Sequence, residues 1–213
     1  FPSPFPEGLD EARDKQFLQA EVLKDHPDTD WIICIDGDEE LERNAGQLIR
    51  HAIRKDIADC FFLPFIHLWN APDQMRTDRW YTNFYRRSLY RPIPGIEFKS
   101  LYKGAGVNVH AGLHTGNAPE SVREAGLGVR IIHYGYMLKE DRIRKWRKYN
   151  HDDPGNMIED QYRHCVQGDV PEVPADLVLK HAGPLKLERV PARFIPEGLD
   201  AEKLKPLDAE VMA

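Results

Sequence analysis

The chain has 213 residues and a mass of 24.6 kDa, enough for one domain with a sizeable core plus an extension. Its net charge of -6, from 29 basic and 35 acidic residues, disfavours broad affinity for nucleic acids. No apolar stretch reaches the length of a membrane span, no signal peptide is visible, and the three cysteines lack zinc-binding or disulfide spacing. We therefore expect a cytoplasmic protein without a transmembrane segment.

Hydrophobic periodicity predicts helices and strands in alternation along the first third of the chain. A helix is expected over 11–24 with Asp10 as its N-cap, followed by a buried strand over 31–35. A second, amphipathic helix follows from Leu41 to Ile57. The apolar run over 60–67 predicts another strand, in which Pro64 indicates an edge position or a bulge. This order favours the α/β class.

The later part of the chain is less regular. Residues 70–104 interleave aromatic side chains with arginines, and short strands are expected near 83–87 and 107–110. A further strand is predicted over 129–133, and a strongly basic helix over about 138–150. Residues 151–213 are rich in proline, so we expect a partly helical, irregular extension after a domain that spans residues 1–150.

The most informative stretch is the acidic run that follows the strand at 31–35. Asp36 and Asp38 form an Asp-x-Asp pair at the expected C-terminal end of that strand, where ligands collect in open α/β sheets. Two carboxylates at this spacing can share one divalent cation. The spacing alone is not specific, because Asp28 and Asp30 match it within a turn. A polar turn that caps the next helix is the alternative interpretation.

Other side chains could complete such a site. His133 also ends a predicted strand, so we expect it at the same sheet edge as Asp38; the alternative is a hydrogen-bonded histidine of the core. Arg79, Lys139 and Lys145 are candidates for neutralising phosphates, although basic residues of this kind often form only a solvated face.

The acidic run also resembles the signature of a known family. Ile-Cys-Ile-Asp-Gly-Asp-Glu-Glu-Leu is similar to the Asp-x-Asp-Glu motif of family 2 glycosyltransferases, which have the GT-A fold. Three further segments follow in the order that this family shows: Phe84-Tyr85-Arg86-Arg87, Val109-His110 and His133-Tyr134-Gly135-Tyr136. The resemblance covers about residues 10–150 and implies a partial GT-A-like, Rossmann-like mixed sheet flanked by helices.

Two departures from the family pattern stand out. Ala111 occupies the position where a glutamate often follows the histidine of the second segment. Nothing in residues 1–30 matches the N-terminal half of the family fold, which holds much of the nucleotide. The resemblance therefore implies either that this half lies outside the sequence or that the chain alone is inactive.

The resemblance implies transfer of a sugar from a nucleotide-diphosphate-sugar donor to a hydroxyl of a saccharide, lipid-linked or protein acceptor, assisted by Mn²⁺ or Mg²⁺. It assigns Asp36, Asp38 and His133 to the cation, and Asp36 also to the donor. In an inverting enzyme a carboxylate removes the acceptor proton, and the candidates are Glu97, which we prefer, Glu39 and Glu40. The alternative role of Glu39 is to support the metal-binding aspartates or to cap the next helix. The sequence leaves a homo-oligomer open.

Two other functions stay open. A phosphohydrolase of the haloacid dehalogenase type also places Asp-x-Asp after a buried strand and would use Asp36 as nucleophile. That family expects threonine or valine where this chain has Glu40. The second alternative is a non-catalytic, degenerate transferase module used for binding or assembly, because the donor-binding half has no counterpart in residues 1–30.

Overall fold

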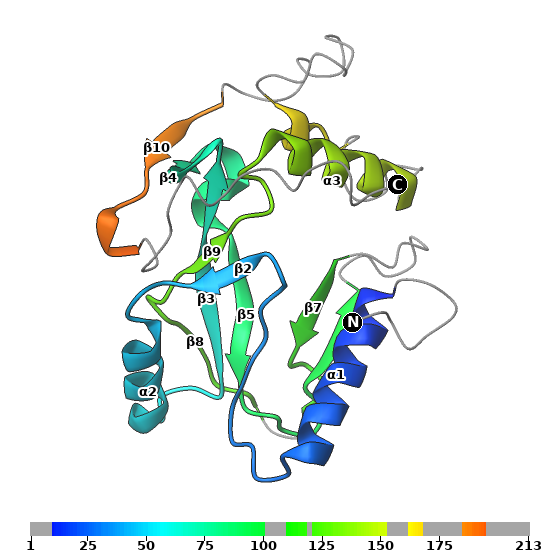
Figure 1. Cartoon of the computed structure of the whole chain (residues 1–213). Coiled ribbons are helices and arrows are strands. Elements are labelled where there is room, and N and C mark those ends of the chain that lie inside the picture. The colour runs from blue at the N-terminus through cyan, green and yellow to red at the C-terminus, as the bar shows by residue number, and fades with distance from the viewer. Residues whose placement is uncertain (1–9, 101–109, 119–120, 153–161, 168–184, 195–213) are drawn as a thin grey trace.

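A computed structural model of the protein describes residues 10–100, 110–118, 121–152, 162–167 and 185–194. In this part the chain forms a mixed α/β fold with a curled eight-stranded sheet, a two-stranded sheet and three α-helices (Figure 1). The predicted α/β class is therefore confirmed. Most of the strand predicted near 107–110, and most of the extension predicted beyond residue 150, lie outside the described residues. Among the described helices, none has the length and apolar character that crossing a membrane requires.

The helices agree with the periodicity of the sequence. Helix α1 spans Glu11–Asp25, and the Asp10 side chain caps it by accepting the backbone N–H of Arg13 at 3.0 Å, as predicted. Helix α2 spans Ala45–Lys55, and the basic helix α3 spans Lys139–Asp152. The expected start of the second helix at Leu41 is wrong, because residues 39–41 form a strand instead.

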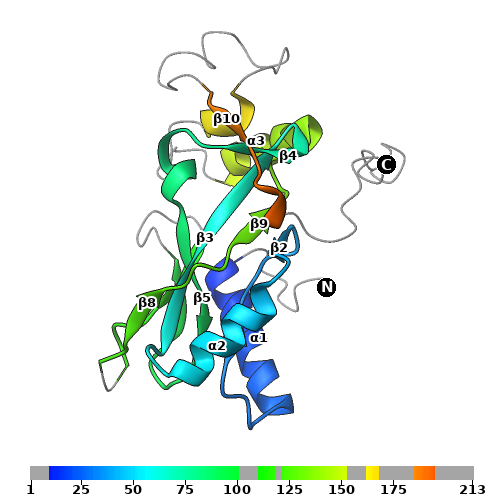
Figure 2. The ribbon, with the colours of Figure 1, turned by 90° about the vertical axis from the view of Figure 1, so that its left-hand side faces the viewer.

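The large sheet is built around one long central strand, β3 (Cys60–Trp69), which connects the lower part of the molecule to the upper part in Figure 2. It pairs antiparallel with β5 and β4 and parallel with β8 and β9. Strand β1 pairs with β5, β2 with β9, and β10 with β4. The other strands of this sheet are β1 (Ile32–Ile33), β2 (Glu39–Leu41), β4 (Ala71–Arg76), β5 (Tyr85–Tyr90), β8 (Glu124–Gly126), β9 (Ile131–His133) and β10 (Leu187–Arg189).

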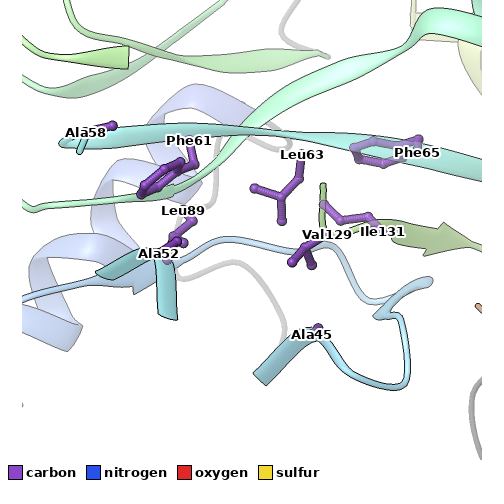
Figure 3. Close-up of a cluster of buried hydrophobic side chains, with 9 residues drawn as sticks. All are labelled: Ala45, Ala52, Ala58, Phe61, Leu63, Phe65, Leu89, Val129 and Ile131. Atoms are coloured by element: carbon purple, nitrogen blue, oxygen red, sulfur yellow. The ribbon is translucent and has the colours of Figure 1, made fainter. Parts of the chain in front are cut away.

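The helices cover different parts of this framework. In Figure 1, α2 lies on one flank of the large sheet, and α1 lies on the other flank beside the two-stranded sheet of β6 (Glu97–Ser100) and β7 (Ala111–His114). Three alternate residues of β3, namely Phe61, Leu63 and Phe65, enter the core that α2 covers, as Figure 3 shows. Helix α3 packs at the far end of β3, over a second core of aromatic side chains: Trp69, Tyr81, Tyr136 and Tyr162.

Two strand predictions need correction. The strand predicted as buried over 31–35 is only Ile32–Ile33 and lies at the end of the sheet order, so Ile33 and Ile35 are 37% and 39% exposed. The strand that contains Pro64 is central rather than an edge strand. Its register shift lies between Phe61 and Phe62, not at the proline.

Pro64 is tolerated in the centre of the sheet because of its position. It lies between the residues of β3 that pair with β8, Cys60–Phe62, and those that pair with β9, Phe65–His67. The next backbone N–H, that of Phe65, points to β5 and donates to the Phe84 carbonyl at 3.1 Å. Residue 64 therefore faces the interval between β8 and β9, where the ladder needs no N–H donor.

Candidate metal site at one end of the sheet

The acidic segment crosses the end of the sheet from one strand to another. Strands β1 and β9 run in the same direction as β3, but they end at different levels. Ile33 of β1 lies level with Phe61 of β3, through Leu89 of β5, whereas His133 of β9 lies beside His67, so residues 34–38 cover the interval between the two strand ends. The chain leaves β1, where Cys34 N–H donates to the Ser88 carbonyl at 2.8 Å, and enters β2 beside β9. The Tyr134 N–H then donates to the Asp38 carbonyl at 2.9 Å. This crossing carries Asp36 to β5 and Asp38 to β9.

Asp38, Glu39 and His133 form a group that could hold one metal ion. One potential ligand atom from each lies within 4.8 Å of the other two, and His133 Nε2 is 3.5 Å from Asp38 Oδ2. Two carboxylate oxygens and one imidazole nitrogen suit Mn²⁺, and the carboxylates suit Mg²⁺. The structure thus brings together two of the three expected ligands and adds Glu39 to them.

Asp36, the third expected ligand, is held by two cations instead. Its Oδ2 lies 2.8 Å from Arg86 Nη1, and its Oδ1 lies 3.1 Å from Lys15 Nζ of α1. Burial alone would raise the pKa of Asp36, but Arg86 and Lys15 keep it below its usual value. Lys15 was not among the predicted site residues, because its position depends on how α1 packs and not on a local motif.

Glu39 anchors the turn that contains the two aspartates. Its side chain is 2% exposed and accepts the Asp36 N–H at 2.8 Å through Oε2, while Arg86 donates to Oε1 at 3.0 Å. Burial raises the pKa of Glu39 above its usual value, against the effect of Arg86. Arg86 also donates to the Cys34 carbonyl at 3.3 Å, so one guanidinium holds both sides of the turn.

A lysine already lies where a metal would be attracted. Lys145 of α3 places its Nζ 2.8 Å from Asp38 Oδ2 and 3.4 Å from His133 Nε2, and we call this point the cation position. Gly135 leaves room for it, since a Cβ at this residue would collide with the Asp38 carboxylate and the Lys145 ammonium. The donors therefore fit a divalent cation, provided that the lysine side chain moves away.

The histidine of the site is neutral at ordinary pH. Burial, followed by the positive charges of Lys145 and Arg86, lowers the pKa of His133 to about 3. His67 is its buried neighbour on β3, and burial lowers the pKa of His67 well below its ordinary value. Neutral imidazole is the form that binds metal ions.

The remaining predicted residues lie elsewhere. Glu97 is in β6, where its carboxylate pairs with Lys99 at 2.6 Å and also contacts Asn117, so it is not part of the metal-binding group. Lys139 is the first residue of α3. Arg79 begins the short 3₁₀-helix Arg79–Asn83, and its side chain lies outside the described part of the chain.

Comparison with models of known protein families gives no match, and no curated protein matches the chain either. The fold and the site thus define a mixed α/β protein with a cluster of carboxylates, lysine and histidine at one end of its sheet. Because a fold hosts many functions, the function has to be argued from that cluster.

Proposed function

We propose that the protein is a glycosyltransferase with a GT-A-like fold, which moves a sugar from a nucleotide-diphosphate-sugar donor to an acceptor hydroxyl with the help of Mn²⁺ or Mg²⁺. The supporting observation is the meeting of three distant segments at one sheet edge. Asp38 and Glu39, Arg86, and His133 come from the acidic run, the aromatic–arginine segment and the last of the ordered segments, and all contribute to one cluster. These are segments on which the resemblance to family 2 glycosyltransferases rests.

Each group in the cluster has a role in this reaction. Asp38, Glu39 and His133 would hold the cation, which would supply Lewis-acid stabilisation of the leaving diphosphate. When Lys145 leaves Asp38, its ammonium becomes available to bind a phosphate oxygen as a point charge. Asp36 keeps lone pairs beyond those used by Lys15 and Arg86, so it can accept a hydroxyl of the donor.

Two of the carboxylates predicted as the base differ in position. Glu39 lies in the site, but Arg86 and the Asp36 N–H hold its oxygens, which favours an anchoring role. Glu97 lies on β6 with Lys99 and Asn117 and stays a prediction for the base. Proton removal by a carboxylate, and with it an inverting mechanism, belongs to the proposal.

The phosphohydrolase alternative has less support. Its nucleophile would need an oxygen that faces a substrate phosphorus, whereas Asp36 directs one oxygen at Lys15 and the other at Arg86. Its aspartates would follow a buried strand, whereas β1 is half exposed and pairs antiparallel with β5. If the wild type hydrolysed an aryl phosphate and Asp36→Asn lost this activity, the phosphohydrolase would be favoured over the transferase.

The non-catalytic alternative has one observation in its favour. Each carboxylate of the cluster already has a basic partner: Lys15 and Arg86 for Asp36, Lys145 for Asp38, and Arg86 for Glu39. The charges are therefore balanced without a metal ion. This alternative predicts that Mn²⁺ does not bind.

Metal binding separates the two proposals. We expect calorimetry to show that the wild-type chain binds Mn²⁺ and that Asp38→Asn loses most of this affinity, because the variant removes an anionic ligand. Asp28→Asn is the matched control, since Asp28 belongs to the exposed Asp-x-Asp pair outside the group. Equal Mn²⁺ affinity in the two variants, or none in the wild type, would contradict the metal site.

The reaction itself is tested on the full-length gene product. We expect Mn²⁺-dependent hydrolysis of at least one sugar donor from a panel of nucleoside-diphosphate sugars, with the activity lost in Asp38→Asn and kept in Asp28→Asn. Complete inactivity with every donor would refute the transferase.

A further inference from the structure

The metal-binding histidine has a second histidine directly behind it. Strands β3 and β9 run parallel, and their register places His67 beside His133. The two Nδ1 atoms lie 3.3 Å apart, and the residues His67 and His133 are 3% and 7% exposed. The other ring nitrogen of His133, Nε2, faces Asp38 and Lys145. His133 therefore has a buried side toward His67 and a second side toward the cation position.

The neighbours of His133 favour one position for its ring proton. A neutral imidazole has one N–H donor and one acceptor nitrogen, and an ammonium group has donors only. Lys145 Nζ lies 3.4 Å from His133 Nε2, slightly nearer than Asp38 Oδ2 at 3.5 Å, and Asp38 Oδ2 already accepts from Lys145 at 2.8 Å, so we assign Nε2 as the acceptor. The proton is then on Nδ1 of His133, which donates to Nδ1 of His67. His67 in turn carries its proton on Nε2.

The surrounding aromatic side chains hold the ring of His67 in place. Tyr81 lies edge-on to it with ring centroids 5.0 Å apart, and Phe84 does so at 5.5 Å. Tyr136 contacts both histidines, at 5.9 Å from His67 and 4.9 Å from His133. A ring enclosed in this way cannot swing aside, so the acceptor nitrogen of His67 stays opposite His133.

We propose that His67 is a positioning residue: it accepts the Nδ1–H of His133 and so keeps the Nε2 lone pair of His133 directed at the cation position. The proposal rests on the metal site of the proposed function, and it deepens that site by naming what orients its histidine. Metal-binding histidines generally donate their second N–H to a carboxylate, a backbone carbonyl or water, and here a neutral imidazole accepts it.

The first experiment needs neither metal nor a variant. In the protein labelled with ¹⁵N at histidine, two-bond ¹H–¹⁵N spectra report which ring nitrogen is protonated. We expect His133 to be the Nδ1–H tautomer and His67 the Nε2–H tautomer in the metal-free wild type. The opposite pair of tautomers would overturn the proposal, whether or not the protein binds Mn²⁺.

The second experiment compares two substitutions of His67. Asparagine places an amide oxygen where Nδ1 was and can accept the same proton, whereas phenylalanine fills the space without an acceptor. We expect His67→Phe to weaken Mn²⁺ binding by about 10- to 100-fold and His67→Asn to stay much closer to the wild type. His114→Phe on β7, outside the metal-binding group, is the control for replacing a histidine by phenylalanine.

The outcomes distinguish this proposal from the proposed function. If wild-type affinity persists in a folded His67→Phe protein, the positioning role is wrong while the metal site stands. If the wild type binds no Mn²⁺ but shows the expected tautomers, the metal site fails and the histidine pair stands. If His67→Phe does not fold, the tautomers of the wild type and the affinity of His67→Asn decide the question.

Discussion

Carboxylates gather at both ends of β3, but their partners differ. At the start of the strand, Asp56 and Asp59 pair with Arg91 and Arg123, and the side chains of Asp56 and Arg123 are 61% and 49% exposed. These are ion pairs between arginine and aspartate near the surface, and among the described residues they are not part of a group that could hold a metal ion. Such pairs hold loops in place and contribute little to stability.

At the other end of β3 the composition of the cluster is different. Glu39 is buried, a neutral histidine lies beside Asp38, and the cation on Asp38 belongs to a flexible lysine rather than to a bidentate arginine. A lysine that makes one short contact can leave, whereas Arg123 holds Asp59 through two nitrogens at 2.8 and 2.9 Å. A cluster of acidic residues is therefore not in itself a binding site. Whether it can bind a metal ion depends on whether its basic partners can move away.

The largest expected effect comes from removing one arginine at each end. Arg86→Leu leaves the buried Glu39 and the partly buried Asp36 without their guanidinium, and we expect it to lower the free energy of unfolding by about 3 kcal/mol or more. Arg123→Leu, at the exposed cluster, should have a much smaller effect. Urea unfolding followed by circular dichroism measures both. If the two variants lost equal free energy of unfolding, the ion pairs of Arg86 would be no more important for stability than those of Arg123.

Acidification should also affect the clusters at the two ends of β3 differently. His67 and His133 have pKa values far below the ordinary 6.5, first because they are buried and then because positive groups such as Lys145 lie nearby. The unfolded chain therefore takes up protons near pH 6.5 that the folded chain does not. The stability that depends on the two neutral histidines is fully present above this pH. It is lost as the pH falls toward the pKa of His133, about 3.

The stability of the wild type should consequently decline between pH 6.5 and 4, by up to about 1.4 kcal/mol per pH unit for each buried histidine. In His67→Phe, the free energy of unfolding measured with urea should depend less steeply on pH over this range. Asp56 and Asp59 have lowered pKa values, so their ion pairs are lost only at more acidic pH, below their ordinary 3.8. Unfolding midpoints that do not change from pH 7 to 4 would contradict the neutral histidine pair.

A smaller effect is expected from the lysine at the cation position. Lys145→Met removes the ammonium that a metal ion has to displace, so we expect Mn²⁺ to bind up to about fivefold more tightly, equivalent to ~1 kcal/mol. Lys148→Met is the control, because Lys148 pairs with Asp152 on the same helix. Weaker Mn²⁺ binding in Lys145→Met, measured by calorimetry, would contradict competition between the lysine and the metal.

Local patterns in the sequence predicted the helices and part of the site. The Asp10 cap and the basic helix were correctly located, because periodicity and capping are local properties. The expected proximity of Asp38 and His133 is observed, but its reason differs from the expected one: β1 ends level with Phe61, and the segment after it continues along the sheet to His133. Strand β2 was missed because Glu39 and Glu40 are typical of a helix start. The burial of Glu39 depends largely on Arg86, which is distant in the sequence.

Long-range packing explains the other differences. Apolar residues 31–35 predicted a buried strand, but a pattern of side chains does not reveal that β1 lies at the end of the sheet order. Likewise, Lys15 reaches Asp36 only because α1 packs beside the two-stranded sheet. Tertiary contacts of this kind have no local signature.

Pro64 has a consequence for the precision of the site. A continuous strand beside β3 could slide by two residues and still bury the same face, since side chains alternate with a period of two. Such a slip would carry His133 about 6.6 Å along the sheet, away from His67. Pro64 lies where the pairing with β8 has ended and the pairing with β9 has not yet begun, so the ladder beside β3 is interrupted at this residue. The pairing that brings His133 beside His67 therefore begins directly after the proline, at Phe65.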